Sequence, residues 1–361
     1  MRVLVLNPGS STLKAALLDA ERGDVVAEAM LEWPAREAGA TDVVGSALER
    51  LPGQAAEAVG YRVVHGGSRY RAPARVDDAL LEAVIALDAL APLHNRRAAA
   101  VMRAGRELLP ALPHVACFDT AFHADLPEDA WRYPLPADWV ERWGIRRYGF
   151  HGLSVTWAIR RAAELLGRPR EDLALVVAHL GSGCSVTAVD GGRSVDTSMG
   201  FTPYEGLMMG TRAGSVDPGI LLRLAGDGVS VNELAEGLAH RSGLSAMAGT
   251  SDMREIERRA DAGDAMATLA VVMFARRAAG AIAAASTALP RVDALVFTGG
   301  IGEHSATSRA AIVARLGALR VPQALTAAEG DSVIAMGPPA VIVVAAREDR
   351  VIAEEVDSLL R

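Results

Sequence analysis

The sequence predicts an α/β fold made of two domains, each built on a mixed β-sheet. Short apolar runs rich in Val and Leu alternate along the chain with longer stretches rich in Ala, Leu, Glu and Arg. Such alternation is typical of strands that are followed by helices. The chain has 361 residues, whereas a single core rarely extends beyond about 250 to 300 residues. A pattern of strand, polar turn and strand also occurs twice, so we expect two domains with a cleft between them.

The repeated pattern begins at the N-terminus. Its first copy comprises an apolar run, a polar turn and a second apolar run, at residues 3–6, 7–12 and 13–19. The second copy has the same three parts at residues 173–178, 179–185 and 186–190. When the two turns are aligned, Gly9 matches Gly181 and Ala16 matches Ala188. This agreement is what a duplicated α/β domain would leave.

The remaining elements are four helices, one further strand and a helix that follows it. Composition predicts the four helices at residues 77–90, 96–108, 153–166 and 261–289. An apolar run at residues 294–298 predicts a buried strand, which leads into glycines and then into a helix from Ser305 to about residue 316. Backbone N–H groups at the start of that helix could hold an anion or the edge of a nucleotide. We expect the domains to comprise residues 1–121 with 350–361, and residues 122–349.

Charge and composition exclude several classes of partner. The formal net charge of −7 argues against sequence-independent binding to nucleic acid or to an anionic membrane. The two cysteines, Cys117 and Cys184, lie in or beside apolar runs, so a disulfide framework or a zinc site is not expected. The N-terminus lacks the pattern of a secretory signal, and Arg276 and Arg277 interrupt the most apolar helix. We therefore expect a soluble cytoplasmic protein.

The segment at residues 196–219 is the strongest indication of a ligand site. It contains five glycines, three methionines and one arginine between two apolar stretches. Glycine lets the backbone approach a ligand closely, and Pro203 and Pro218 stiffen the turns. Arg212 supplies a planar fork of donors that suits a carboxylate or a phosphate. An irregular core loop is the alternative interpretation.

The turn at residues 7–14 also offers groups that bind phosphate. It is not a Walker A motif, because the second glycine before Lys-Ser/Thr is missing. The hydroxyls of Ser10, Ser11 and Thr12, together with Lys14, could surround a phosphate, although an ordinary polar hairpin has the same composition. Six of the eight histidines lie in short motifs with Gly, Asn or Asp: His65, His94, His123, His151, His179 and His304. Their spacing does not favour a zinc site.

Taken in order, these motifs resemble those of the acetate kinase family, which is part of the actin-like ATPase and sugar kinase superfamily. The matching segments cover almost the whole chain and lie at residues 7–14, 62–67, 93–95, 118–123, 148–152, 179–181, 196–219, 300–303 and around 348. The resemblance implies duplicated actin-like, ribonuclease H-like domains with mixed sheets around an interdomain cleft. It also implies reversible transfer of the γ-phosphoryl group of ATP to a short carboxylate, with ATP or ADP as co-substrate, Mg²⁺ as the metal (Mn²⁺ could replace it), and a homodimer.

The resemblance assigns catalytic roles to six residues. Arg62 and Arg212 would hold the carboxylate and the transferring phosphoryl group, as two forks that neutralise charge. His151 would donate to a phosphoryl oxygen in the transition state, and Asp119 would orient an arginine or the nucleophile. Asn7 and Glu348 would bind the Mg²⁺ ion, which takes oxygen ligands.

The resemblance also assigns the two substrate pockets. The acid would lie against four apolar residues: Val64, Leu93, Phe150 and Pro203. The nucleotide would contact residues of four segments: Lys14; His179, Leu180, Gly181, Ser182 and Gly183; Asp252, Met253 and Arg254; and Gly300, Ile301, Gly302, Glu303 and His304. Because Val64 keeps the pocket narrow, we expect acetate rather than propionate, although another short-chain acid is the alternative. Ser182 stands where the family usually has Asn. A different phosphoryl donor, such as pyrophosphate, is therefore an alternative.

A non-enzymatic alternative is an actin-like module that uses ATP as an assembly switch. Such a module has no need for Arg62 and Arg212 beside a small apolar pocket. The sequence therefore favours the kinase.

Overall fold

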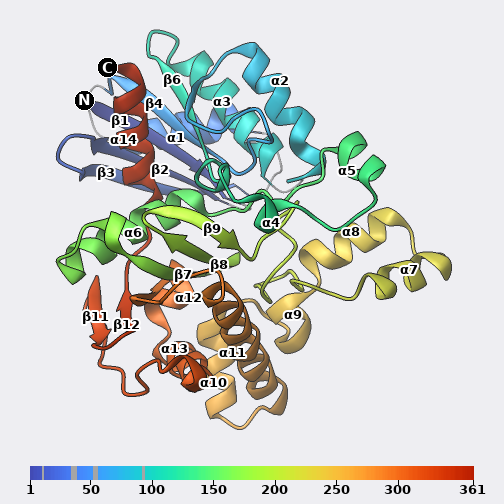
Figure 1. Ribbon diagram of the computed structural model, residues 1–361. Helices are drawn as coiled ribbons and strands as arrows, with labels where there is room; N and C mark the ends of the chain where they lie inside the picture. Colours follow the sequence, from blue (N-terminus) through green and yellow to red (C-terminus); the bar gives the residue numbers. More distant parts are fainter. Residues whose placement is uncertain (10–11, 34–38, 52–55, 92–93) are drawn as a thin grey trace. The chain divides into compact units, whose positions relative to one another are not determined.

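The computed structural model describes residues 1–9, 12–33, 39–51, 56–91 and 94–361. Contacts divide the chain into two compact units (Figure 1). The first comprises Met1–Ala124, Phe150–Trp157 and Arg347–Arg361, and the second comprises Asp125–Gly149 and Ala158–Ala346. The sequence placed the boundaries at residues 121/122 and 349/350, and it assigned Phe150–Trp157 to the second domain. Each unit contains one six-stranded mixed sheet.

The sheet of the first unit has the strand order β3-β2-β1-β4-β6-β5. Its strands are β1 (Arg2–Pro8), β2 (Thr12–Asp19), β3 (Asp24–Glu32), β4 (Ala58–Val63), β5 (Ala74–Arg75) and β6 (His114–Phe118). Strand β1 pairs antiparallel with β2 and parallel with β4, and β4 pairs parallel with β6. The carboxyl ends of β1, β4 and β6 therefore meet at one edge of the sheet.

The sheet of the second unit repeats this arrangement in the order β9-β8-β7-β10-β12-β11. Its strands are β7 (Ala174–Leu180), β8 (Cys184–Asp190), β9 (Arg193–Thr197), β10 (Ala294–Thr298), β11 (Ser332–Ala335) and β12 (Ala340–Val343). Strand β7 is antiparallel to β8 and parallel to β10, and β10 is parallel to β12. Order and direction match the first sheet strand for strand, so the predicted duplication and the α/β fold class are confirmed.

The two hairpins that suggested the duplication occupy equivalent places. In the first unit the N–H of Gly9, just after β1, donates to the carbonyl oxygen of Thr12 at 2.8 Å. In the second unit the N–H of Gly181, just after β7, donates to the carbonyl oxygen of Gly183 at 3.0 Å. Each glycine therefore begins the turn of its hairpin.

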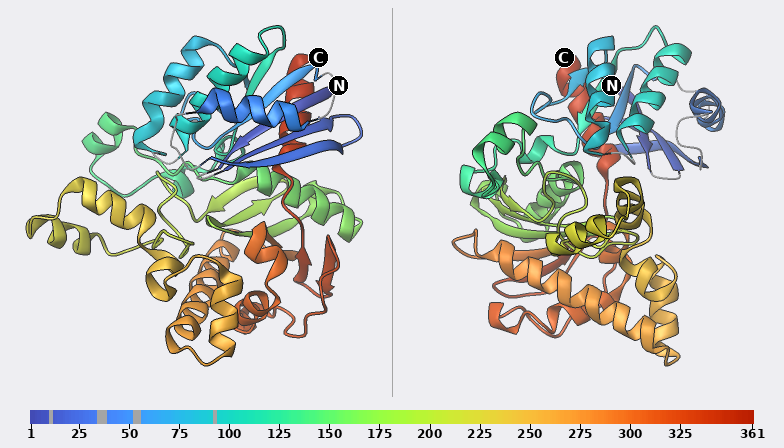
Figure 2. Two further views of the ribbon diagram at one scale, coloured as in Figure 1. Left: turned by 180° about the vertical axis from the view of Figure 1, so that it is seen from behind. Right: turned by 90° about the vertical axis from the view of Figure 1, so that its right-hand side faces the viewer.

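Helices lie between and beside the strands of both units (Figures 1 and 2). The α-helices are α1 (Ala40–Arg50), α2 (Asp78–Ala86), α3 (Asn95–Leu108), α4 (Glu128–Trp131), α5 (Ala137–Trp143), α6 (Gly152–Leu166), α7 (Pro218–Gly226), α8 (Val231–His240), α9 (Gly243–Ala248), α10 (Met253–Asp261), α11 (Ala265–Ser286), α12 (Gly299–His304), α13 (Ala306–Val313) and α14 (Glu348–Leu360). Short 3-10 turns are η1 (Leu87–Ala89), η2 (Ala121–His123), η3 (Arg170–Asp172) and η4 (Gly317–Leu319).

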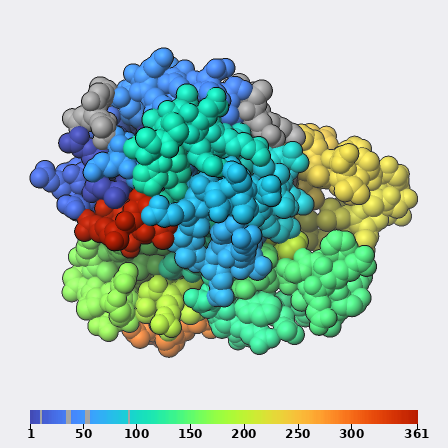
Figure 3. Space-filling model, turned by 90° about the horizontal axis from the view of Figure 1, so that it is seen from above, coloured from blue at the N-terminus to red at the C-terminus, as the bar shows by residue number. Residues whose placement is uncertain are grey.

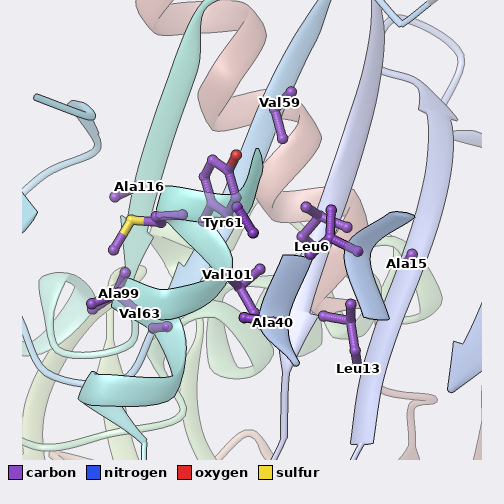
Figure 4. Packing of buried hydrophobic residues seen from close by; sticks show 14 of the residues in the cluster. Leu6, Leu13, Ala15, Ala40, Val59, Tyr61, Val63, Ala99, Val101 and Ala116 are labelled. Carbon is purple, nitrogen blue, oxygen red and sulfur yellow. The ribbon is translucent and has the colours of Figure 1, made fainter. Parts of the chain in front are cut away.

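Two adjacent residues of β4 show how helices cover both faces of the first sheet. Successive strand residues point to opposite faces. A Cβ placed on Gly60 would lie 2.6 Å from a side-chain carbon of Ile352, so α14 packs closely on that face. A Cβ on Gly105 of α3 would lie 2.0 Å from the hydroxyl of Tyr61, so α3 covers the other face. The core on the α3 side includes Leu6, Leu13, Tyr61, Val63 and Val101 (Figure 4).

Helix α11 is the one described helix that is long and apolar enough to span a membrane, by length and composition alone. It packs instead on β7 and β8, with Ala270, Phe274, Ala278 and Ile282 buried. It begins at Ala265 rather than at the expected residue 261. Gly263 adopts a positive φ of 88°, and the side chain of Asp264 accepts from the N–H groups of Met266 and Ala267 as an N-cap.

The glycines after β10 are helical, which corrects the sequence-based assignment. We expected a loop before a helix at Ser305, but Gly299–His304 forms helix α12. Ser305 does cap the next helix, because its side chain accepts from the N–H of Ser308, and that helix ends at Val313. Composition missed α12 because glycine disfavours helices in isolation, whereas tertiary contacts can override this preference.

Candidate active site

Four predicted site residues lie together at the carboxyl edge of the first sheet. Asn7 is near the end of β1, Arg62 is near the end of β4, and Asp119 directly follows β6. Arg62 Nη2 lies 2.6 Å from Asp119 Oδ2, and its Nε donates to Oδ1 at 3.1 Å. Arg62 Nη1 lies 3.0 Å from Oε2 of Glu348, the first residue of α14. Asn7 Nδ2 donates to the same Glu348 oxygen at 3.1 Å.

Arg62 is the positive partner of both carboxylates in this cluster. Asp119 is fully buried, and burial raises the pKa of its carboxyl group. Arg62 lowers that pKa and Glu348 raises it further. Burial alone would lower the pKa of Arg62, but Asp119 and Glu348 outweigh burial and raise it. The guanidinium is thus held charged between two acidic side chains at the carboxyl edge of the sheet.

The turn after β4 is fixed by Asn95, a residue to which sequence reasoning gave no role. Its Oδ1 accepts from the N–H of His65 at 3.1 Å, and its Nδ2 donates to the His65 carbonyl oxygen at 3.0 Å. The neighbouring Val64 is buried, as is Phe150, whose ring meets the His65 ring edge-on at 5.3 Å between centroids. Val64 and Phe150 are predicted walls of the acid pocket, whereas Leu93 lies outside the described residues.

His151 has a backbone conformation that is rare for a residue with a side chain. Its φ is 60°, in the left-handed region. The N–H of the following Gly152 donates to the carbonyl oxygen of Asp119 at 3.0 Å, and a Cβ on Gly152 would lie 2.3 Å from that oxygen. The glycine therefore lets the His151 segment lie directly on the Asp119 backbone. Strained residues of this kind are concentrated at functional sites.

In the second unit, three glycine-containing segments come together. A Cβ on Gly181 would lie 3.8 Å from the backbone nitrogen of Gly300, and one on Gly299 would lie 2.8 Å from the carbonyl oxygen of Leu180. The N–H of Gly210 donates to the Ser182 carbonyl oxygen at 3.0 Å. The turn at 181–183, the start of α12 and the segment around residue 210 are thus packed against one another, and His179 lies beside the same glycines.

Arg212 is buried in this unit, and burial lowers the pKa of its guanidinium. Its Nη1 donates to the carbonyl oxygen of Pro203, itself buried, at 2.6 Å. The N–H groups of Ser242, Leu244 and Ser245 at the start of α9 donate to the carbonyl oxygens of residues 211, 209 and 210, each at 2.9 Å. This approach requires Gly243, since a Cβ there would lie 2.2 Å from the Met209 carbonyl oxygen. Sequence reasoning missed Gly243.

Several of the residues predicted to bind the nucleotide do not pack against these glycine segments. The side chain of Arg254 is 88% exposed and pairs with Asp252 at 2.8 Å. The side chain of His304 is 78% exposed, and Glu303 accepts from the N–H of Ala346 at 2.9 Å. Met253 is buried in α10, whereas Lys14 is exposed on β2 and Ile301 and Gly302 belong to α12. The glycines are therefore drawn together, while Arg254 and His304 extend into solvent.

Among the residues that the structure describes, no group of three or more His, Cys, Asp or Glu side chains is arranged to hold a metal ion. Asn7 and Glu348 offer one amide oxygen and one carboxylate. This donor set fits Mg²⁺, which commonly takes one or two carboxylates and completes its shell with waters and phosphate oxygens.

The two sheets of equal topology, each with a glycine turn after its first strand, define an α/β protein of the actin-like type. The chain belongs to the acetokinase family, whose model matches residues 49–354. The acetate kinase of Deinococcus deserti is 48% identical over 345 residues, which cover 88% of this chain and 86% of that protein. The crystal structure of Porphyromonas gingivalis acetate kinase is 33% identical over the full length of both chains, with a TM-score of 0.87. A propionate kinase from Francisella tularensis is 34% identical over 98% of both chains, with a TM-score of 0.86. The family resemblance seen in the motifs is confirmed.

Proposed function

We propose that this protein is an acetate kinase that transfers the γ-phosphoryl group of ATP to acetate and forms acetyl phosphate and ADP reversibly. The observation that carries the proposal is the Arg62 cluster of a member of the acetokinase family, in which Asp119 and Glu348 hold a charged guanidinium at the carboxyl edge of the sheet. Such an arginine suits a small carboxylate, because a guanidinium that is held charged attracts an anion.

The chemistry requires little proton transfer. Acetate is already ionised at neutral pH, so its oxygen can attack phosphorus without a general base. The main barrier is repulsion between this oxygen and the phosphoryl group, and positioning and neutralisation of charge lower it. Arg62, oriented by Asp119, would hold the carboxylate, and Arg212 would hold the phosphoryl group. His151 would donate to a phosphoryl oxygen as the bond to ADP breaks.

The glycine segments of the second unit would bind the nucleotide. The start of α12 offers backbone N–H groups at Gly299 and Gly300, which have no side chains that would block a phosphate, and it lies against the turn at 181–183. His179 lies beside them. The exposed side chains of Arg254 and His304 would contact the nucleotide, for which Arg254 would have to leave Asp252. Pyrophosphate is the alternative donor.

Mg²⁺ would be held by Glu348 and Asn7, with Mn²⁺ as a substitute. When bound, the ion would neutralise charge on the phosphate oxygens. Glu348 pairs with Arg62 at 3.0 Å, so the arginine and the ion would share this carboxylate.

Acetate is the proposed acid because Val64 and Phe150 are both bulky and buried, and Pro203 is buried in the second unit. One methylene is worth only about 1 to 3 kcal/mol in such a pocket, so propionate would be a weaker substrate rather than an excluded one. The similarity to a propionate kinase keeps that acid as the alternative.

We also propose a cytoplasmic homodimer with no nucleic-acid or membrane partner. The alanine-rich part of α11 does not offer a contact for a second copy at Ala278, Ala279, Ile282 and Ala285, because these residues are buried inside the second unit. Apolar side chains suited to a contact with a second copy lie instead on α7 and α8, where Leu222 is 74% and Val231 is 78% exposed. Figure 3 shows this segment in yellow at the surface.

The activity is tested by trapping acyl phosphate with hydroxylamine. MgATP is supplied with acetate, propionate or butyrate, and pyrophosphate replaces ATP in a parallel set. Acyl phosphate should form about tenfold faster with acetate than with propionate, which is the discrimination that one methylene can supply. If propionate gave more acyl phosphate than acetate, the kinase activity would stand but the choice of acid would be wrong. If no acid gave acyl phosphate, the proposed function would be wrong.

A further inference from the structure

Arg147 lies outside the residues that sequence reasoning selected, yet its guanidinium faces several backbone acceptors. Nη1 donates to the carbonyl oxygens of three consecutive residues, Thr197, Ser198 and Met199, at 3.1, 3.3 and 3.1 Å. These residues begin the glycine-rich segment that leads to Arg212. One cation therefore holds the start of this segment in place.

Glu205 and Tyr133 extend this contact further along the segment. Arg147 Nη2 lies 3.2 Å from Glu205 Oε1, and the Tyr133 hydroxyl donates to Glu205 Oε2. The Tyr133 oxygen in turn accepts from the N–H of Phe201 at 3.2 Å. We call Arg147, Glu205 and Tyr133 the loop clamp. Arg147 and Tyr133 thus bond both to the backbone of residues 197–201 and to the side chain of Glu205.

The packing around Gly200 shows how closely the loop clamp encloses this segment. A Cβ on Gly200 would lie 1.8 Å from Glu205 Oε2 and 2.1 Å from the Tyr133 hydroxyl. The Gly200 carbonyl oxygen also accepts from the N–H of Tyr148 at 3.0 Å. Because no side chain fits there, Gly200 is required for this arrangement.

The enclosed segment carries the acceptor of Arg212. Pro203 lies between Gly200 and Glu205, and its carbonyl oxygen accepts from Arg212 Nη1 at 2.6 Å. Within the described part of the chain, this is the one hydrogen bond that the Arg212 guanidinium makes. The orientation of Arg212 therefore depends on the position of the Pro203 carbonyl group.

We propose that the loop clamp positions Arg212 for phosphoryl transfer, an inference that rests on the proposed function. Arg147, Glu205 and Tyr133 are positioning residues, because they act through Pro203 on a guanidinium that would contact the phosphoryl group. A small displacement of that guanidinium lowers the rate, since transition-state stabilisation depends on geometry. Loss of the clamp should then reduce turnover more than it weakens ATP binding.

The first test compares Glu205→Gln and Tyr133→Phe with the wild type. Glutamine removes the negative charge that faces Arg147, so kcat for acetyl phosphate formation should fall about tenfold or more in Glu205→Gln. The KM for ATP should stay within about twofold. Glu128→Gln is the matched control, because Glu128 pairs with Arg132 at 3.0 Å in the same region but is exposed. It should leave kcat unchanged.

The second test asks whether the clamp acts through Arg212. Glu205→Gln is combined with Arg212→Lys, and kcat is compared with both single variants. If the clamp works through Arg212, the double variant should be no more than about threefold slower than Arg212→Lys alone, since residues that act as a unit are not additive. Fully additive losses, or an equal rise in the KM for ATP and fall in kcat, would overturn the proposal.

Thermal unfolding of each variant separates a loss of fold from a loss of positioning. If Glu205→Gln does not fold, Tyr133→Phe replaces it in the double variant, because this change removes a single hydroxyl. A wild-type protein that forms no acyl phosphate would overturn the proposed function, whereas an active wild type with additive variants would overturn only the clamp.

Discussion

Arg62 and Asp119 form a fork in which Nη2 lies 2.6 Å from Oδ2 and Nε donates to Oδ1 at 3.1 Å. They are brought together because β4 and β6 are parallel neighbours, so that residues at their carboxyl ends lie side by side. The contact uses one side of the guanidinium. Glu348 engages the other side through Nη1.

Asp119→Asn should lower kcat about tenfold to a hundredfold while the protein stays folded. The amide cannot accept both hydrogen bonds of the fork with a full negative charge, and hydrogen bonds to charged groups contribute about 1.5 to 3 kcal/mol. Steady-state rates with acetate and ATP measure the loss. Asp78→Asn is the control, since Asp78 pairs with Arg106 on an exposed surface. Equal activity of the two variants would remove Asp119 from the proposed mechanism.

Gly60→Ala should reduce the free energy of unfolding by about 1 to 3 kcal/mol through overpacking. The new methyl group would meet Ile352 at 2.6 Å and Val356 at 2.9 Å, so α14 would have to move. Because α14 begins with Glu348, kcat should fall as well. Urea unfolding and initial rates measure the two effects.

Gly45→Ala is the matched control for that substitution. Nothing lies within 4 Å of a Cβ at Gly45 in α1, and alanine favours a helix by up to about 1 kcal/mol. This variant should be as stable as the wild type or slightly more stable. If it lost as much stability as Gly60→Ala, the close approach of α14 would not be the cause.

Much of the fold could be predicted because its signals are local. The apolar runs of β1, β2, β7 and β8 and the glycines that follow β1 and β7 indicate the duplication that the two sheets show. The Arg62 cluster could be anticipated for a similar reason, since polar residues that follow buried strands gather at a sheet edge.

The contacts that sequence reasoning missed join residues distant in the chain. Arg147 binds carbonyl groups about 50 residues further on, and Gly243 admits the loop that ends at Arg212. Carbonyl acceptors exist at every position, so no side-chain pattern marks which ones an arginine will find. Helix α12 was missed because its glycines are helical only in their tertiary context.

Val64→Ala should shift the acid preference toward propionate. Val64 is buried after β4, and Asn95 fixes the backbone of the next residue, so the methyl groups removed would leave room instead of collapsing the turn. The ratio of kcat/KM for propionate to that for acetate should rise about tenfold. Ala91, buried just after η1, provides a neighbouring apolar position for comparison. An Ala91→Gly variant should leave the ratio unchanged, and an unchanged ratio in Val64→Ala would exclude Val64 from the pocket wall.

His123 should make the protein less stable as the pH falls. Burial lowers the pKa of His123 to about 4, although the hydrogen bond to the Phe150 carbonyl oxygen opposes this shift. In the unfolded chain the pKa of the imidazole is about 6.5. Between these values the unfolded state binds a proton that the folded state does not, so the free energy of unfolding rises with pH over this window and falls as acid is added. The loss should approach about 3 kcal/mol near pH 4.

His123→Gln tests this predicted pH dependence of stability, because glutamine keeps an N–H donor for Phe150 but does not titrate. Urea unfolding of the wild type and the variant is measured from about pH 7.5 to 4.5. The wild type should lose more stability than the variant as the pH falls through about 6.5, and the difference should grow toward pH 4.5. His240→Gln, at an exposed position of α8, should follow the wild-type curve. Parallel curves for wild type and His123→Gln would show that His123 takes up its proton in the folded state, which would require the buried ring to leave the Phe150 carbonyl or to find an anion.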